Sequence, residues 1–239
     1  MIQLRKLNKS YGPLRAVNDL DLEVPSGELF CFLGPNGAGK TSTIKMMTGL
    51  VRPDSGSILI DGVDALANPL EARRRLGYIP DTPYLYERLT VVEYLEFVGQ
   101  LYEVPRGELR ARTDEYLEIF TLTDKRGALI RNLSHGMRQR VIYAATLLHN
   151  PRVLLVDEPF VGLDPHSIRL IKDLLRARTR TGVTIFMTTH ILAIAEEIAD
   201  RIGIIDHGRM ALCGTLDELR PQFQQGTSLE DLFLRLTEQ

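Results

Sequence analysis

The sequence has few cysteines, no long apolar run and almost no net charge. Its two cysteines, Cys31 and Cys213, lie far apart without the short spacing of metal ligands; this excludes a disulfide-rich scaffold and predicts reduced thiols in the cytoplasm. Apolar runs such as residues 29–33 and 153–156 are far shorter than the ~20 residues that cross a bilayer. The first ten residues, MIQLRKLNKS, do not resemble a signal peptide. If membranes matter, we expect another chain to span them.

The chain has almost no net charge, so it lacks the positive electrostatic field that would attract a polyanion such as nucleic acid. A formal charge of −2 and a pI near 6.2 make nucleic acid an unexpected partner. With 44% hydrophobic and 25% charged residues, the composition has no signature of disorder. The 239 residues are enough to bury a large core, and they suit one large domain or one domain with an insertion.

Short apolar runs alternate with longer stretches of helical periodicity over much of the chain. Buried runs that are each followed by an amphipathic stretch indicate a parallel sheet covered by helices, which is an α/β architecture. The predicted strands are residues 29–33, 154–156 leading into Asp157, 183–187 and 201–205.

Two segments depart from this rhythm. Residues 84–149 show helical periodicity without an intervening strand, which predicts an α-helical insertion. Its predicted apolar stripes contain Val91, Tyr94, Leu95, Val98, Tyr116, Leu117, Phe120, Met137, Val141, Ala144 and Leu148. The first 28 residues and residues 54–62 instead predict short strands joined by Gly-rich turns, hence a small antiparallel sheet beside the core.

A phosphate-binding loop follows the first buried strand. Residues 34–42 read GPNGAGKTS and precede a helical pattern. In the motif G-x-x-x-x-G-K-[ST], glycines let backbone N–H groups turn toward phosphate oxygens at a helix start, where the dipole also favours anions. Lys40 is expected to reach the outer phosphates and Thr41 to ligate Mg²⁺. A glycine-rich loop with a solvated lysine is the alternative, but the strand before and the helix after are the context that the motif requires.

Two acidic residues end the second buried strand. Residues 153–159 read VLLVDEP, which places Asp157 and Glu158 at the carboxyl edge of the predicted sheet, where open α/β sheets bind ligands. Asp157 is expected to hold the metal, and Glu158 to orient and polarise the attacking water. Alone, DEP also fits a polar strand exit turned by Pro159; the phosphate loop upstream favours the metal site.

Seven sequence elements occur in a fixed order: Tyr11, GPNGAGKTS, LGYIPD at 76–81, LSHGM at 133–137, VLLVDEP, VGLD at 161–164 and His190. This ordered set resembles the ATP-binding subunit of an ABC transporter over nearly the whole chain. The ending SLEDLFLRL, residues 228–236, and the signature LSHGM are most similar to the branch that powers separate permeases in drug-resistance, sodium-efflux or polysaccharide-type export.

The resemblance implies a P-loop NTPase (RecA-like) core with an N-terminal antiparallel β subdomain and an inserted α-helical subdomain. It implies ATP and Mg²⁺ as cofactors, and nucleotide bound by Gly34, Pro35, Asn36, Gly37, Ala38, Gly39, Lys40, Thr41 and Ser42. It also implies that two subunits face head to tail, so that one covers the γ-phosphate held by the other. The residues expected to act in trans are Ser134, His135, Gly136, Met137 and Asp164.

Several of these residues have a second interpretation. Ser134 is also a good N-cap for a helix, although Gly136 in a first turn costs stability and permits close approach of a phosphate. Tyr11 resembles the aromatic residue that stacks on adenine, but it also suits packing at a turn. His190 resembles the histidine that contacts the γ-phosphate, whereas a lone histidine there also fits a strand cap. GLD at 162–164 alone would be only a turn.

Asp81 departs from the family pattern, which has Gln or Glu at this position. Its side chain is one methylene shorter than that of Gln and negatively charged. We therefore expect Asp81 to couple the ATP site to the helical insertion, with weaker metal contact.

The predicted organisation is one ABC domain with residues 1–83 and 150–219 as the catalytic core and β subdomain, 84–149 as the helical subdomain and 220–239 as a C-terminal amphipathic helix. The expected partners are an integral-membrane permease, whose helix meets exposed apolar residues such as Tyr84, Leu85 and Tyr86, and a second ATP-binding subunit in a homodimer or heterodimer. The expected location is cytoplasmic, peripheral on the inner face of the cell membrane. The alternative is a soluble ABC-type ATPase with a non-membrane partner, which usually carries two modules or a long coiled coil.

Overall fold

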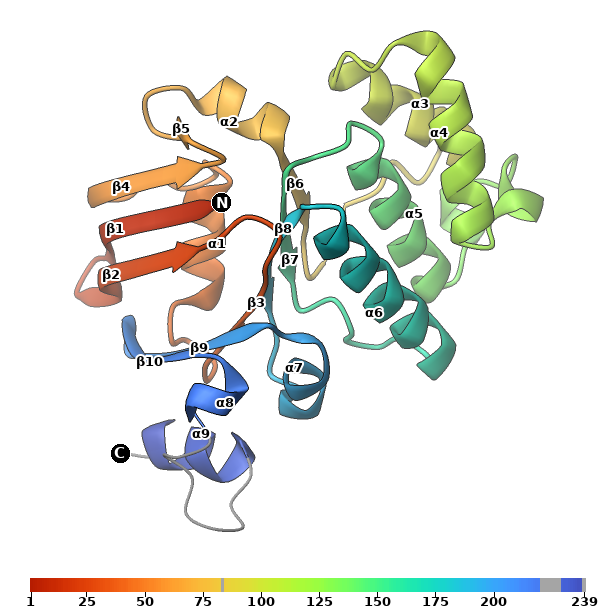
Figure 1. Cartoon of the computed structure of the whole chain (residues 1–239). Coiled ribbons are helices and arrows are strands. Elements are labelled where there is room, and N and C mark those ends of the chain that lie inside the picture. The colour runs from red at the N-terminus through yellow and green to blue at the C-terminus, as the bar shows by residue number, and fades with distance from the viewer. Residues whose placement is uncertain (83, 220–228, 238–239) are drawn as a thin grey trace.

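A computed structural model describes residues 1–82, 84–219 and 229–237 of the chain (Figure 1). A central six-stranded sheet has the order β10-β9-β3-β8-β7-β6. Its strands are parallel except at the edge, where β10 runs antiparallel to β9. The bounds are β3 Leu29–Leu33, β6 Leu76–Ile79, β7 Val153–Asp157, β8 Thr184–Thr188, β9 Arg201–Asp206 and β10 Arg209–Gly214. The predicted parallel sheet is confirmed, with strand ends displaced by at most one residue.

The central sheet separates two hydrophobic cores. In a strand, successive side chains point to opposite faces. In β3, Cys31 therefore belongs to the core beneath the helices, whereas Phe30 and Phe32 belong to the core beneath the second sheet. In β7, Leu154 belongs to the core beneath the helices and Leu155 to the core beneath the second sheet. The continuous apolar runs read from the sequence reflect strands that are buried on both faces.

The second sheet is antiparallel and has the order β2-β1-β4-β5. It lies on the opposite side of the central sheet from the helical region (Figure 1). Its first two strands are longer than predicted, because they form one hairpin that turns at Gly12 and Pro13. The bounds are β1 Ile2–Tyr11, β2 Leu14–Val24, β4 Ser55–Ile60 and β5 Val63–Asp64.

Residues 84–149 form helices that pack beside the central sheet. Helix α3 begins with a capping box between Thr90 and Glu93, and its apolar stripe of Val91, Tyr94 and Leu95 is buried as predicted. The helices of the described chain are α1 Lys40–Met47, α2 Pro69–Arg75, α3 Val91–Leu101, α4 Arg106–Ile119, η1 Thr123–Lys125, η2 Ile130–Asn132, α5 His135–Leu147, α6 Pro165–Arg180, α7 Leu192–Ile198, α8 Leu216–Leu219 and α9 Leu229–Thr237.

The end of the described chain docks on the core. Leu229 of α9 is buried, and its backbone N–H donates to Glu196 Oε1 of α7 at 3.2 Å. Phe233 and Leu236 pack against the same core. Within the predicted C-terminal helix over 220–239, the structure describes α9 from Leu229; residues 220–228 and 238–239 and the side chain of Leu232 lie outside the described residues.

Both cysteines are free, Cys31 buried and Cys213 exposed, which confirms the predicted unpaired thiols. Within residues 1–82, 84–219 and 229–237, none of the helices combines the length and hydrophobicity that crossing a membrane requires.

His149 connects the helical region to the central sheet. Its ring stacks on Tyr102 with centroids 3.8 Å apart and an interplanar angle of 9°. Its Nε2–H donates to the carbonyl oxygen of Leu76, at the start of β6, at 3.1 Å. Burial lowers the pKa of His149 to about 4, so the ring is neutral in the folded protein at neutral pH.

Acidification should therefore weaken the fold through His149. The unfolded chain takes up a proton near its ordinary pKa of 6.5, whereas the folded chain does so only near pH 4, so stability is lost as pH falls through this window. Between pH 7 and pH 5 we expect wild type to lose up to about 2 kcal/mol more unfolding free energy than His149→Gln. Urea titrations of both proteins at the two pH values measure this; equal losses would contradict it.

Candidate active site

The phosphate loop connects β3 to α1. Gly39, directly before α1, has a φ of 115°, and a Cβ there would lie 2.4 Å from the carbonyl oxygen of Ala16. Only glycine fits this position without displacing the β2 backbone. The local sequence thus places the start of α1, with its free N–H groups, at the carboxyl edge of the central sheet.

Lys40 folds back over its own loop. Its Nζ donates to the carbonyl oxygens of Gly34 at 2.6 Å and Pro35 at 3.1 Å. Burial lowers the pKa of Lys40, and the charges of Glu158 and Asp157 oppose that shift. The ammonium group therefore has two carboxylates nearby and no ion pair with either among the described residues, a position from which it can exchange loop carbonyls for phosphate oxygens.

Asp157 is fixed at the end of β7. Its Oδ1 accepts from the hydroxyl of Thr188 in the neighbouring strand at 2.5 Å. Burial raises the pKa of Asp157, the Thr188 hydrogen bond lowers it, and the charge of Asp81 raises it further. The carboxylate is thus oriented by β8 and is electrostatically suited to gain a cation.

Glu158 and His190 form a contact across the same edge. His190 Nδ1–H donates to Glu158 Oε2 at 2.8 Å, and the His190 backbone N–H donates to the same oxygen at 3.2 Å. Glu158 has a φ of 47°, a conformation that costs roughly 1 kcal/mol for a residue with a side chain and that clusters at functional sites. Two hydrogen bonds from its N–H to Thr188 O and Oγ1 hold it there.

The structure brings most of the predicted residues to one cavity of about 330 Å³. Tyr11, 45% exposed, forms its outer wall, while Asp81 and Glu158 face the loop. Asp157 and His190 do not line the cavity. His190 is hydrogen-bonded to Glu158, and Asp157 is linked to Glu158 through Thr188, which is hydrogen-bonded to both. The lining residues are Tyr11, Leu14, Ala16, Pro35, Asn36, Gly37, Gly39, Lys40, Thr41, Ser42, Asp81 and Glu158.

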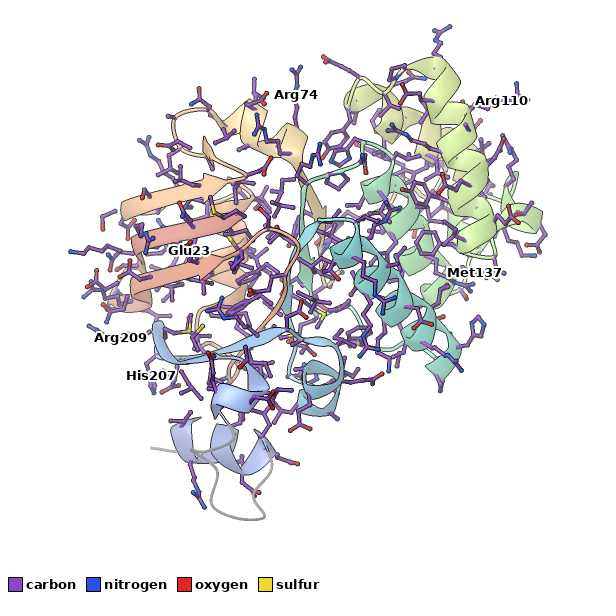
Figure 2. The ribbon with its side chains drawn as sticks, viewed as in Figure 1. Glu23, Arg74, Arg110, Met137, His207 and Arg209 are labelled. Carbon is purple, nitrogen blue, oxygen red and sulfur yellow. The ribbon has the colours of Figure 1, made fainter. Side chains whose placement is uncertain are left out.

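A second predicted set lies elsewhere on the surface. Ser134 caps α5 by accepting from the Met137 N–H at 3.3 Å, and both it and His135 are exposed. Neither these two residues nor Gly136 and Met137 line the phosphate-loop cavity of the described chain. Figure 2 shows Met137 on the side of the molecule opposite the four-stranded sheet.

The loop before α6 lies beside this helix start. Asp164 caps α6 through Ser167, whose backbone N–H and hydroxyl donate at 3.0 and 2.6 Å and lower the Asp164 pKa. A Cβ on Gly136 would lie 3.5 Å from Asp164 Oδ2, an ordinary contact. Packing within the chain therefore does not require glycine at 136. Residues 134–137 and 161–164 lie beside each other at the surface, where all but the half-buried Gly136, Met137 and Leu163 are exposed.

Sequence reasoning missed three residues of the site. Leu14 and Ala16 line the cavity from β2 beside Tyr11. Thr188 orients both acidic residues. The only signal for Thr188 was the polar pair Thr188–Thr189 interrupting a β-rich run before His190.

A match to a known protein family assigns the chain to that family. Residues 17–161 match the family model described as ABC transporter. The chain belongs to the ABC transporter family. As a member, this ABC ATPase binds ATP and hydrolyses it. The family match spans the phosphate loop, Asp157 and the α5 start.

The relatives agree with this assignment. The linearmycin resistance ATP-binding protein LnrL of Bacillus subtilis is 39% identical over 92% of the chain and 70% of its own length. A Nod factor export ATP-binding protein I of Cupriavidus metallidurans is 37% identical over 92% of the chain and 72% of its own length. The chain thus spans about seven tenths of these relatives.

Solved structures share the whole fold. One described as the structure of the ATP binding subunit of an ABC transporter has 35% identity and a TM-score of 0.93, over 99% of both chains. The dimeric post-hydrolysis structure of the ATP-binding cassette MJ0796 bound to ADP and Pi has 26% identity and a TM-score of 0.82, over 90% of this chain and 99% of that one. The predicted fold class and family are confirmed.

The ABC ATPase has a donor set that fits Mg²⁺ only together with a nucleotide. The described residues contain no cluster of three or more His, Cys, Asp or Glu side chains able to hold a metal unaided. Mg²⁺ at phosphate sites is typically held by one or two carboxylates and by phosphate oxygens. The Thr41 hydroxyl, the Asp157 carboxylate and the nearby Asp81 suit such a site.

Asp81 offers a direct test of the metal site. Its charge is felt at Asp157, and its side chain lines the cavity. We expect Asp81→Asn, which removes only the charge, to raise the free Mg²⁺ concentration for half-maximal hydrolysis about threefold or more. Asp81→Gln tests the effect of side-chain length. Unchanged magnesium titrations for both variants would remove Asp81 from the metal site.

Proposed function

We propose that this chain is the energy-supplying subunit of a membrane exporter and that two copies of it enclose two ATP molecules. In each site, one copy supplies the phosphate loop, Asp157, Glu158 and His190. The other supplies Ser134 and the backbone N–H groups of residues 135–137, which cover the γ-phosphate, with Asp164 beside them. The observation that carries this proposal is the separation of the exposed 134–137 surface from the cavity of its own chain.

The chain's own groups have distinct tasks in the proposed reaction. Lys40 exchanges its bonds to the loop carbonyls for phosphate oxygens and neutralises charge on them. Tyr11 stacks on the adenine ring. Glu158 accepts a proton from the attacking water, while His190, held by Glu158, keeps the transferred group in line. Thr41 and Asp157, with Asp81 nearby, would hold Mg²⁺, which would supply Lewis-acid neutralisation of the phosphates.

The start of α5 suits an anion from outside the chain. Four backbone N–H groups are unpaired at any helix start, and the dipole adds about half a positive charge there. Ser134 already satisfies one of these groups, the Met137 N–H. A phosphate that docks here bonds to the free N–H groups and shares the Met137 N–H with Ser134, so it is bound without a charged side chain. Release of the phosphate after hydrolysis removes this contact, so the closed pair loses its main attraction.

Export through a separate permease is supported by the relatives and by an apolar surface. One relative is named an export ATP-binding protein. Tyr84 is 91% exposed, and a cavity of about 540 Å³ is lined by Tyr86, Phe97 and their neighbours, with the rings of Tyr86 and Phe97 5.3 Å apart. We assign this surface to a permease segment, with the ATPase on the cytoplasmic side of the membrane.

Purification of the tagged chain from its own cells tests the transport role. We expect detergent extracts to contain an integral-membrane protein at a fixed ratio to the chain. Tyr86→Asp, which places a charge on the apolar surface, should release that protein without lowering ATP binding. Arg169→Gln, on the exposed face of α6, is the matched control. Recovery with ribosomes or other soluble complexes, and no membrane protein, would contradict the proposal.

A further inference from the structure

A groove between α3 and α4 carries positive charge away from the nucleotide site. It encloses about 370 Å³ and shares no residue with the phosphate-loop cavity. Figure 2 shows Arg110 of this groove on α4, at the outer edge of the helical region. Three arginines and one glutamate line the groove in a chain whose net charge is −2. The lining residues are Glu96, Gln100, Arg106, Leu109, Arg110, Thr113 and Arg126.

The two helices touch at the floor of the groove. A Cβ on Gly99 of α3 would lie 2.2 Å from Leu109 Cδ1 of α4, so glycine permits a close crossing at this point. Residues one helical turn apart then form the two walls: Glu96 and Gln100 on α3, and Arg106 and Arg110 on α4. The floor of the groove is thus formed by the Leu109 side chain packed against the Gly99 backbone.

The arginines of the groove are unequally paired. Arg126 pairs with Asp114, and the neighbouring Arg112 pairs with Glu108 at 2.6 Å. Across the described part of the chain, Arg106 and Arg110 make neither an ion pair nor a hydrogen bond. Glu108 and Asp114 of α4 are therefore already engaged, and the two guanidinium groups, one turn apart, have no bonded carboxylate among the described residues, although Glu96 lines the same groove.

Thr113 supplies an independent sign of a missing partner. Its side chain lines the groove and is 1% exposed, yet its hydroxyl oxygen has no hydrogen-bond partner among the described residues. Other helical threonines avoid this: Thr43 donates to the Gly39 carbonyl at 2.9 Å. An unsatisfied buried hydroxyl destabilises the fold, so an acceptor placed in the groove would remove that penalty.

We propose that this groove is a binding site for a small organic oxyanion, a carboxylate or phosphate ester that also carries a hydroxyl or amine. Arg106 and Arg110 bind the oxyanion, since planar guanidinium groups match such groups bidentately. The Thr113 hydroxyl donates to it from the floor. Glu96 and Gln100 accept from the donor at the other end. The volume lies within the range of small-molecule sites.

Side-chain NMR of the full chain tests the site directly. The Nε–H signals of arginine report on Arg106 and Arg110 one by one, once assigned with Arg106→Gln and Arg110→Gln. At low salt we expect L-malate, phosphoserine or both to shift these two signals saturably, with a Kd of about 1 mM or below. Malate alone assigns a carboxylate and phosphoserine alone a phosphate. Sodium chloride at matched ionic strength should give no saturable shift.

Substitutions separate this site from general charge attraction. Arg110→Gln and Thr113→Val should each weaken binding about tenfold, whereas Arg169→Gln should not change it. Thr113→Val keeps the shape and removes the unsatisfied hydroxyl, so its thermal midpoint should not fall. Shifts that only rise linearly with either probe, or unchanged affinity in both Arg110→Gln and Thr113→Val, would overturn the proposal. Neither result bears on ATP hydrolysis, which uses other residues.

Discussion

Replacing Glu158 with Gln is expected to slow ATP hydrolysis at least about 100-fold while ATP still binds. A general base typically contributes 10²- to 10⁴-fold, and the amide cannot take the proton from water. Its oxygen still accepts the His190 bond now made at 2.8 Å, so the site keeps its shape. Lys40 and the phosphate loop are untouched. Single-turnover hydrolysis and equilibrium ATP binding, measured on the same preparation, separate the two effects.

The same variant should accumulate the closed pair. ATP that binds and is not cleaved keeps its contact with the partner's α5 start, so the dimer population rises with ATP and Mg²⁺. Light scattering after gel filtration should give twice the 27.0 kDa chain mass. Hydrolysis at the wild-type rate would remove Glu158 from the role of base. A strictly monomeric ATP-loaded form would contradict the enclosed pair.

Replacing Ser134 with Asp is expected to abolish ATP-driven dimerisation and to reduce hydrolysis at least about 50-fold. Asp is as good an N-cap as Ser, so α5 should remain folded. Its carboxylate, however, would face the γ-phosphate of the other copy and repel it. Affinity of the separate chain for ATP should be unchanged, because Ser134 does not line its own chain's cavity.

Ser134→Asn is the matched control for this substitution. Asn also caps a helix but carries no charge, so we expect it to retain most of the dimer and a measurable rate. Equal losses in Asp and Asn variants would assign the effect to α5 geometry instead of charge. No loss in either would exclude Ser134 from the reaction.

Local patterns were enough to predict much of the fold and of the site. The phosphate loop could be predicted because glycine spacing, Lys40 and the flanking elements are contiguous in the chain. The β3 and β7 runs could be predicted because strands buried on both faces are continuously apolar. Their joint position at the carboxyl edge then followed from the general geometry of parallel sheets.

Features that depend on contacts between distant segments could not be predicted. Thr188 orients Asp157 and Glu158 from a strand 30 or more residues away in the chain. The stacking of His149 on Tyr102 and the groove at Gly99 depend on how helices cross. The roles of Ser134 and Asp164 remain a prediction, because a single chain shows their caps and exposure and not the partner that they would meet.

A shared reaction centre has a thermodynamic consequence. In the proposed pair, neither chain stabilises the developing charge on the γ-phosphate alone, so we expect hydrolysis to follow pairing and to stop when the pair opens. Such an arrangement would convert the presence of ATP into a change in the distance between two surfaces. A permease bound to the helical regions would be moved by that change, which is how hydrolysis would perform mechanical work.

Mixing two inactive variants tests the shared centre most directly. Lys40→Ala disables the phosphate loop and Ser134→Asp disables the start of α5, and each variant should be almost inactive alone. In a mixed pair, one site combines the intact phosphate loop of the Ser134→Asp chain with the intact α5 start of the Lys40→Ala chain. Pairs of two identical variants contain no intact site, and each mixed pair contains one intact site of two, so an equimolar mixture should recover measurable hydrolysis, at most roughly half of the wild-type rate. A mixture no more active than the two separate variants would contradict a site built from two chains.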